Sequence, residues 1–157
     1  MKETICTARL YAASDQAACE AIFHSNVPEF FSPDEFWDFQ AFLADPRAHF
    51  LVALDQDATV VGCGGCYVQE IIGCLCWGMV DQKLHGRAIG SYLLRERLAW
   101  LFAHPTVCEA SVRTSQRSAG FFECFGFVTV NVTPGAFGSG LDEVSMTLSR
   151  ARWCDQG

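Results

Sequence analysis

Three small residues, Gly86, Ala88 and Gly90, lie two positions apart between an apolar run and a helical pattern. A helix N-terminus leaves backbone N–H groups unpaired and carries partial positive charge, so it attracts anions. Small side chains let a phosphate group approach that backbone closely, and Arg87 could add a charge-assisted hydrogen bond. The same spacing also fits a plain turn in which the glycines only relieve crowding. It fits neither a P-loop, which needs Gly-Lys-Ser/Thr, nor a dinucleotide fingerprint.

Nine cysteines are many for 157 residues, and four of them lie close together in sequence: Cys63, Cys66, Cys74 and Cys76. The odd spacing of Cys63 and Cys66 places them on opposite faces of a strand, so four thiolates would not converge on one zinc ion. An odd number of cysteines, without the apolar core of an export signal, argues against a disulfide framework. We therefore predict buried free thiols, no metal and a cytoplasmic protein, with a redox or metal protein as the alternative.

Hydrophobic periodicity indicates the elements that must position these groups. It predicts strands at residues 5–11, 49–55, 59–68, 74–80, 107–114, 127–133 and 142–149. It predicts helices at about 14–24, from Ser32 to before Pro46, at about 88–103 and at 116–125. In the third helix, an apolar stripe should be buried and three charged residues should mostly turn outward. The stripe is Leu94, Leu98, Leu101 and Phe102, and the charged residues are Arg95, Glu96 and Arg97.

Composition and element order limit the fold and the partners. A chain of 157 residues is enough for one domain, which we place at residues 1–157. Hairpin strands followed by alternating strands and helices predict a mixed sheet in an α/β domain. A net charge of −7 argues against a nucleic-acid partner or an anionic membrane surface. The longest apolar run, residues 71–80, falls short of the ~20 residues that span a bilayer.

Two motifs resemble those of one family. WGMVDQKLHGRAIGSYLL, residues 77–94, resembles motif A of the GNAT N-acetyltransferase superfamily, where an Arg/Gln-x-x-Gly-x-Gly/Ala turn holds the pyrophosphate of acetyl-CoA. The turn falls here on residues 85–90. TSQRSAGFFECFGF, residues 114–127, is similar to the family's helix that ends in Gly-Phe and continues into a strand. The resemblance covers nearly the whole chain. It implies the GNAT-like acyl-CoA N-acyltransferase fold, a mixed, mostly antiparallel sheet flanked by helices.

The resemblance also implies an activity and a set of site residues. The activity is direct transfer of the acetyl group of acetyl-CoA to a primary amine of a small molecule or peptide, without a metal; the family also allows a homodimer. Glu70 lies near the position of the glutamate base of several members, although a solvated turn carboxylate is the alternative. The residues expected to bind acetyl-CoA are Met79, Val80, His85, Gly86, Arg87, Ala88, Ile89, Gly90 and Ser91.

Three residues depart from the family pattern. His85 replaces Arg or Gln and can donate only one hydrogen bond to phosphate when neutral. Ala88 replaces Gly and should resist a positive φ. Phe122 stands where many members carry a tyrosine that protonates the leaving thiolate, and phenylalanine has no proton to give. Phe122 therefore favours an alternative function, a catalytically weak acetyl-CoA-binding module that senses or regulates.

An acidic and aromatic segment between residues 28 and 43 could form the acceptor site. Asp34, Glu35 or Asp38 could attract an amine to an apolar pocket. The alternative is an aromatic helix face packed on the sheet. The aromatic residues in question are Phe30, Phe31, Phe36, Trp37 and Phe39.

Overall fold

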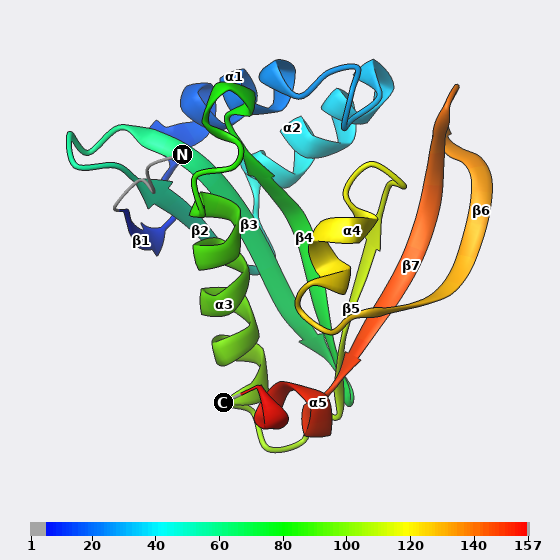
Figure 1. The fold of residues 1–157 in the computed structure, drawn as a ribbon. Coiled ribbons are helices and arrows are strands. Elements are labelled where there is room, and N and C mark those ends of the chain that lie inside the picture. The colour runs from blue at the N-terminus through cyan, green and yellow to red at the C-terminus, as the bar shows by residue number, and fades with distance from the viewer. Residues whose placement is uncertain (1–5, 157) are drawn as a thin grey trace.

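Seven strands form a single mixed sheet, as the computed structural model shows for residues 6–156 (Figure 1). The strand order is β1-β2-β3-β4-β5-β7-β6, and every neighbouring pair is antiparallel except β4 and β5. The predicted mixed, mostly antiparallel sheet is thereby confirmed. Ile5, the predicted start of the first strand, lies outside the described residues. The strands are β1 (Thr7–Leu10), β2 (His49–Leu54), β3 (Val60–Gln69), β4 (Ile72–Val80), β5 (Glu109–Thr114), β6 (Val128–Gly138) and β7 (Leu141–Ser149).

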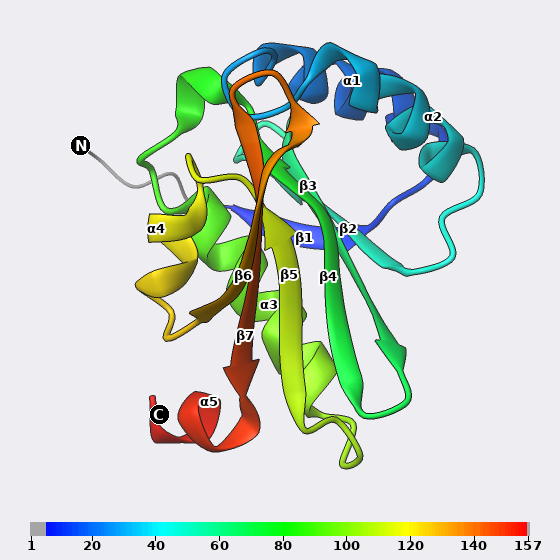
Figure 2. The same ribbon diagram turned by 90° about the vertical axis from the view of Figure 1, so that its right-hand side faces the viewer.

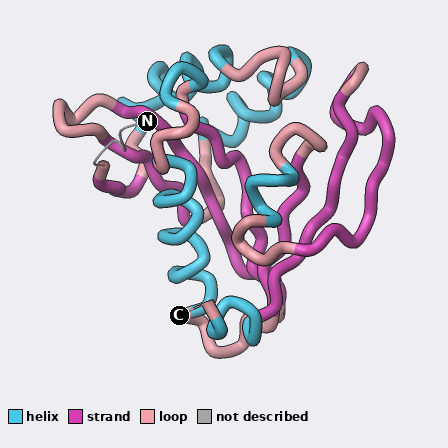
Figure 3. Tube along the Cα trace, viewed as in Figure 1, coloured by secondary structure: helices cyan, strands magenta, loops and turns pink. Residues whose placement is uncertain are grey.

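Helices cover both faces of the sheet (Figures 2 and 3). The two N-terminal helices pack on one face, and the third and fourth helices pack on the other. A short C-terminal helix that the sequence reading did not predict follows the last strand. The predicted helix at 116–125 forms only over its centre. The helices are α1 (Gln16–Ser25), α2 (Phe36–Ala44), α3 (Ile89–Phe102), α4 (Ala119–Glu123) and α5 (Arg150–Asp155), with single 3₁₀ turns at Ala13–Asp15, Pro33–Glu35 and Gln82–Leu84.

Local capping fixes the entry into α2. The Glu35 carboxylate accepts a hydrogen bond from the backbone N–H of Ser32 at 2.8 Å, and Pro33 occupies the first turn. This is one half of the capping arrangement that the Ser-Pro-x-Glu spacing predicts, and the Glu35 N–H donates to the Ser32 backbone carbonyl at 3.1 Å. It holds Glu35 at a defined place at the start of the helix, which matters for the cavity described below.

The predicted buried stripe of α3 is confirmed, but the outward placement of Arg97 is wrong. Leu94, Leu98 and Leu101 are fully buried in the main core cluster. Arg97 is buried as well, with only 4% of its surface exposed. The reason lies in the facing strands, where Gly64 and Gly78 leave the volume that the arginine side chain fills. Helical periodicity alone does not reveal a space made by glycines on other elements.

The sheet separates the cysteines as predicted. Cys63 packs into the core beneath α1 and α2, whereas Cys66 packs into the core beneath α3. All nine cysteines fall within the described residues and are free thiols. Among residues 6–156, no group of three or more His, Cys, Asp and Glu side chains could hold a metal ion. In the same range, no helix is long and apolar enough to cross a bilayer.

The last strand in the sheet order, β6, exposes a row of valines. Val128, Val130 and Val132 are each about half exposed, and β6 pairs with β7 on one side only. The oligomeric state of the chain stays a prediction.

Candidate active site

The sheet opens where β4 and β5 diverge. The two strands pair in register only from Ile72 to Cys74, opposite Glu109 to Ser111. Beyond Cys74 the ribbons separate toward the α1–α2 end of the molecule (Figure 1). The edge of β4 from Leu75 to Val80 therefore lacks a strand partner on its β5 side in the described chain. A free strand edge presents backbone N–H and C=O groups that an extended ligand can use.

A bulge distorts β4 along this free edge. From Cys63 to Gly65, β3 advances two residues while its partner moves from Met79 to Cys76, so β4 carries one extra residue. Trp77 lies at the bulge with φ +49°, a left-handed conformation that is strained for a bulky side chain. Its ring packs 5.0 Å from that of Phe39, between the centroids. Bulges of this kind re-aim the backbone next to ligand sites.

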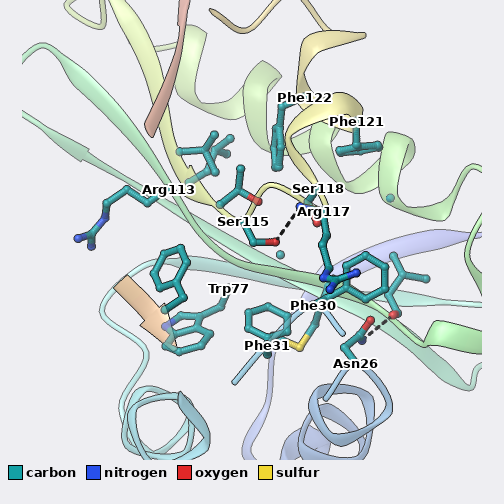
Figure 4. A pocket seen from close by; sticks show the side chains of 18 of the residues that line it. Asn26, Phe30, Phe31, Trp77, Arg113, Ser115, Arg117, Ser118, Phe121 and Phe122 are labelled. Carbon is teal, nitrogen blue, oxygen red and sulfur yellow. Dashed lines mark hydrogen bonds between the residues drawn. The ribbon is translucent and has the colours of Figure 1, made fainter. Parts of the chain in front are cut away.

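A cavity of about 930 Å³ occupies the opening (Figure 4). Its walls come from the free edge of β4, the N-terminal turn of α3, the end of β5, the β5–α4 connection, α4, the end of β6 and the segment that enters α2. Elements distant in sequence therefore meet around a single volume. The residues that line it include Asn26, Phe30, Phe31, Asp34, Glu35, Asp38, Cys76, Gly78, Met79, Val80, His85, Gly86, Ala88, Ile89, Gly90, Ser91, Arg97, Ser115, Arg117, Ser118 and Phe122.

The N-terminal turn of α3 faces the cavity as an unpaired helix end. Tyr92 donates the first intrahelical hydrogen bond, to the Ala88 carbonyl at 3.0 Å, which leaves the N–H groups of residues 89–91 without intrahelical acceptors. Ala88 adopts φ +67°, ψ 7°, the positive φ that an alanine is expected to resist. The turn imposes this conformation, and an alanine there is held against a local cost of about 1 kcal/mol.

His85 lies in the cavity wall, but its side chain already contacts other residues of the protein. Its Nε2 lies 2.9 Å from the Val80 carbonyl oxygen, and its ring meets Phe30 edge-on at 5.1 Å between centroids. The buried Asn26 amide donates to the same carbonyl oxygen at 2.9 Å. The two side chains therefore fix the end of β4 relative to α1 and to the α3 turn. The sequence reading missed Asn26, because no local pattern marks a buried amide at a helix end.

The cations around the cavity differ from those expected. Arg87 does not line the cavity, and its Nε is buried without a hydrogen-bond partner in the described chain. Arg117, in the β5–α4 connection, lines it instead, and its side chain extends into the open volume in Figure 4. Its backbone N–H donates to the Ser115 hydroxyl at 3.3 Å. The only sequence feature that could have indicated Arg117 as a site residue is its position just before α4, within the second motif.

Glu70 is not brought to the cavity. It forms the tight turn between β3 and β4 with Ile71, since Gln69 pairs with Ile72, and it is exposed. Val80, which lines the cavity, lies at the other end of β4. Glu70 takes φ +57°, as a turn residue often does. The placement is that of the solvated turn carboxylate considered as the alternative.

Three other carboxylates line the cavity, and Glu35 is the most enclosed of them. Asp34 and Asp38 are exposed, whereas Glu35 is partly buried. Burial raises the pKa of Glu35, the Ser32 N–H hydrogen bond opposes this, and the charge of Asp38 adds to the increase. A carboxylate with a raised pKa next to a cavity can accept a proton near neutral pH.

The aromatic segment divides between cavity and core. Phe30 and Phe31 line the cavity, whereas Phe39 is fully buried between α1 and the sheet. Phe36 stacks on His24 at 4.5 Å between centroids, and Trp37 is 68% exposed. The predicted packing of aromatic side chains on the sheet is therefore confirmed for Phe39, whereas an acceptor site at Phe30 and Phe31 stays a prediction.

Phe122 occupies the α4 wall of the cavity. Its ring packs against Phe121 and Phe127 at 5.2 and 5.4 Å between centroids. Hydroxyl groups on this wall come from Ser115 and Ser118 instead. No aromatic hydroxyl from α4 faces the cavity in the described chain, because α4 has no tyrosine.

Solved structures of acetyltransferases share the fold of this chain. A GCN5-related N-acetyltransferase from Kribbella flavida is 19% identical with a TM-score of 0.74, covering 92% of this chain and 97% of that one. The spermidine/spermine N-acetyltransferase SpeG from Vibrio cholerae is 12% identical with a TM-score of 0.74, covering 96% and 97%. The yncA protein of Salmonella typhimurium, solved with its cofactor acetyl-CoA, is 16% identical with a TM-score of 0.72, covering 93% and 94%. At these identities the likeness shows the fold.

Sequence comparison gives the family. No curated protein matches the sequence closely. The profile of the acetyltransferase (GNAT) family matches residues 17–127, which extend from α1 through the α3 turn to the end of the second motif. The match spans well over half of the chain and includes most of the cavity wall. The chain therefore belongs to the acetyltransferase (GNAT) family.

Proposed function

We propose that the protein transfers the acetyl group of acetyl-CoA to a primary amine by direct attack of the amine on the thioester. One observation carries the proposal: the unpaired N-terminus of α3 and the unpaired edge of β4 open into the same cavity. The first is suited to a pyrophosphate and the second to an extended amide-bearing arm. Acetyl-CoA has both parts in one molecule.

The cosubstrate would lie along these two surfaces. The N–H groups of Ile89, Gly90 and Ser91, with Gly86 and Ala88 in the turn, bind the pyrophosphate. The approach is open at Gly90, where an added Cβ would meet only ordinary contacts at 3.6 Å or more. Arg117 supplies the nearby positive charge in place of Arg87.

The pantetheine arm follows the backbone of Met79 and Val80. The Val80 carbonyl is already bound by Asn26 and His85, so these side chains position the strand rather than contact phosphate. His85 belongs to the site in this indirect role. Backbone N–H groups on the free edge are the natural donors for the thioester carbonyl, where negative charge develops during attack.

Glu35 is the base in this proposal, in place of Glu70. An amine attacks only when neutral, so its ammonium proton must first be removed. The Glu35 carboxylate is held by the Ser32 N–H, lines the cavity and has a raised pKa. The neutral amine nitrogen then bonds to the carbonyl carbon, the carbon–sulfur bond breaks, and CoA leaves as a thiolate. The nitrogen passes its second proton through water to that thiolate, and Glu35 releases its own proton to solvent.

Phe122 does not block this route. A thiol has an ordinary pKa of about 8.5, so a thiolate is a good leaving group near neutral pH without a dedicated acid. The lack of a hydroxyl at Phe122 nevertheless favours the second candidate, an acetyl-CoA-binding module with little turnover.

Turnover on a panel of amines separates the two candidates. The purified chain is given acetyl-CoA with a polyamine, amino acids, a peptide with a free N-terminus, or a lysine peptide. Released thiol and the mass of the acetylated product are both measured. Acetylated product from at least one amine supports the transferase, and loss of activity in Glu35→Gln but not in Glu96→Gln, an exposed residue of α3, supports the base. Binding of acetyl-CoA without product from any amine supports the sensing module instead. Failure to bind acetyl-CoA contradicts both.

A further inference from the structure

Arg97 of α3 is buried in a space that two strands leave for it. Its guanidinium lies against Gly64 of β3 and Gly78 of β4, so a Cβ at either glycine would come within 2.8 Å of it. Alanine at either position would therefore displace the arginine side chain. The glycines of β3 and β4 therefore leave space for the arginine side chain of α3.

The buried cation lacks a counter-charge. Its Nε donates to the Leu93 carbonyl at 3.2 Å, and its Nη1 makes a long contact of 3.4 Å with the Gly65 carbonyl. Across residues 6–156, no carboxylate pairs with Arg97, and Nη2 has no hydrogen bond. A buried charge that is incompletely paired is costly, because its desolvation is not offset by a counter-charge.

The neighbouring thiols do not supply the missing charge. Burial raises the pKa of Cys66 to about 12 and that of Cys76 to about 11, so both stay protonated near neutral pH. Burial also lowers the pKa of Arg97, but an arginine starts so high that it stays cationic.

Arg97 reaches the cavity on the cosubstrate side of the sheet. It lines the cavity together with Gly78 and Cys76, on the free edge of β4. Its Nη2 is the atom that a Cβ on Gly78 would meet first, at 2.8 Å, within the segment that would hold the thioester. It arrives from α3, the helix whose N-terminus would bind the pyrophosphate. The acidic residues of the proposed acceptor side belong to the segment entering α2, which packs on the other face.

We propose that Arg97 binds a substrate carboxylate, and that this carboxylate belongs to the acyl group of the donor. The natural donor would then be a short dicarboxylic acyl thioester of CoA, such as succinyl-CoA. This rests on the proposed acyl transfer from CoA to an amine and changes only the acyl group, so that acetyl-CoA is a weaker donor than the dicarboxylic thioester. The carboxylate completes the hydrogen bonds of the guanidinium through charge-assisted contacts. It passes unchanged into the product, because only the carbon–sulfur bond breaks and only the carbon–nitrogen bond forms.

The donor arm of the test compares two acyl thioesters of equal carbon count, succinyl-CoA and butyryl-CoA, and adds acetyl-CoA as the donor of the proposed function. Calorimetry measures the affinities of the unmodified chain for succinyl-CoA, butyryl-CoA and acetyl-CoA. We expect succinyl-CoA to bind at least tenfold more tightly than butyryl-CoA, about 1.4 kcal/mol. Arg97→Met should remove that ratio, and Arg97→Lys, which keeps the charge but not the planar fork, should retain part of it. Equal affinities in the unmodified chain would overturn the donor assignment, whatever the variants do.

The acceptor arm asks whether the carboxylate comes from the amine. With acetyl-CoA as donor, kcat/KM is compared for phenylalanine and for phenylethylamine, which lacks its carboxylate, in the unmodified chain and in Arg97→Met. A preference for phenylalanine that disappears in Arg97→Met would assign Arg97 to the acceptor and overturn the donor assignment. No carboxylate preference in either arm would overturn the role of Arg97 altogether. Failure of all three acyl thioesters to bind would instead contradict the proposed transferase, so the two failures are distinguishable.

Discussion

Ala88→Gly should stabilise the protein, because glycine adopts the conformation of the α3 turn without strain. Ala88 lies at φ +67°, where an alanine costs about 1–2 kcal/mol relative to its favoured regions. Glycine removes this cost but loses about 0.5–1 kcal/mol through the greater freedom of the unfolded chain. The expected net gain is about 0.5–1 kcal/mol in the free energy of unfolding. For a chain of this length, that corresponds to a rise of about 1–4 °C in Tm.

The structure offers a matched control for this change. Ala58, in the exposed turn between β2 and β3, adopts φ +61° and lies outside the cavity wall. Urea unfolding of Ala58→Gly should therefore show a similar gain. The affinity of Ala88→Gly for acetyl-CoA should stay within about twofold, less than 0.5 kcal/mol, since the N–H groups of the turn are unchanged. A gain at Ala58 with none at Ala88 would refute the strained turn at the start of α3.

Three further changes test the base, a cap and the core. In Glu35→Gln the amide oxygen can still accept a hydrogen bond from the Ser32 N–H, so the variant should fold. Its kcat/KM should no longer rise as pH passes through the raised pKa of Glu35. A pH profile unchanged from wild type would exclude Glu35 as the base. Because the pKa of Glu35 is raised in the folded protein, its neutral form stabilises the fold below the pKa of the unfolded chain, and this stabilisation is lost as pH rises through the raised pKa of the folded protein. Above that pKa, Glu35→Gln should therefore have a higher Tm than wild type. Asp15→Ala removes a buried carboxylate held by Arg9 at 2.7 and 2.9 Å and by the Ala12 N–H, at a cost of about 2 kcal/mol near pH 7. Because these bonds lower the pKa of Asp15, the difference in urea unfolding should shrink as pH falls through that lowered pKa, and a difference that persists at the lowest pH would contradict the ion-pair explanation. Leu98→Ala opens the fully buried α3 core and should cost about 2–5 kcal/mol by the same assay; a loss under 1 kcal/mol would mean that the core is not packed as described.

Local patterns predicted the elements well, because alternation and capping act over a few residues. The hydrogen bond from the Ser32 N–H to Glu35 and the opposite faces of Cys63 and Cys66 follow from spacing alone. The inward turn of Arg97 does not, because it depends on glycines in strands that only the folded sheet brings near.

In the candidate site, too, the sequence predicted local features but not contacts between separate elements. The small residues of the α3 turn line the cavity because a strand-to-helix turn is a local feature. Glu70 was placed by analogy of sequence position, whereas the bulge and divergence of β4 decide which end of the strand borders the cavity. Glu35 and Arg117 reach the cavity through the packing of separate elements, which no local pattern encodes.

The binding of acetyl-CoA at the N-terminus of α3 is tested most directly by calorimetric titration of Gly90→Asp beside Gly90→Asn. Both side chains have the same shape, and an added Cβ meets only ordinary contacts, so both variants should fold. An aspartate in the first turn favours the helix but repels a bound pyrophosphate. We predict that Gly90→Asp binds acetyl-CoA at least tenfold more weakly than Gly90→Asn. Equal affinities in the two folded variants would contradict a pyrophosphate site at this helix end.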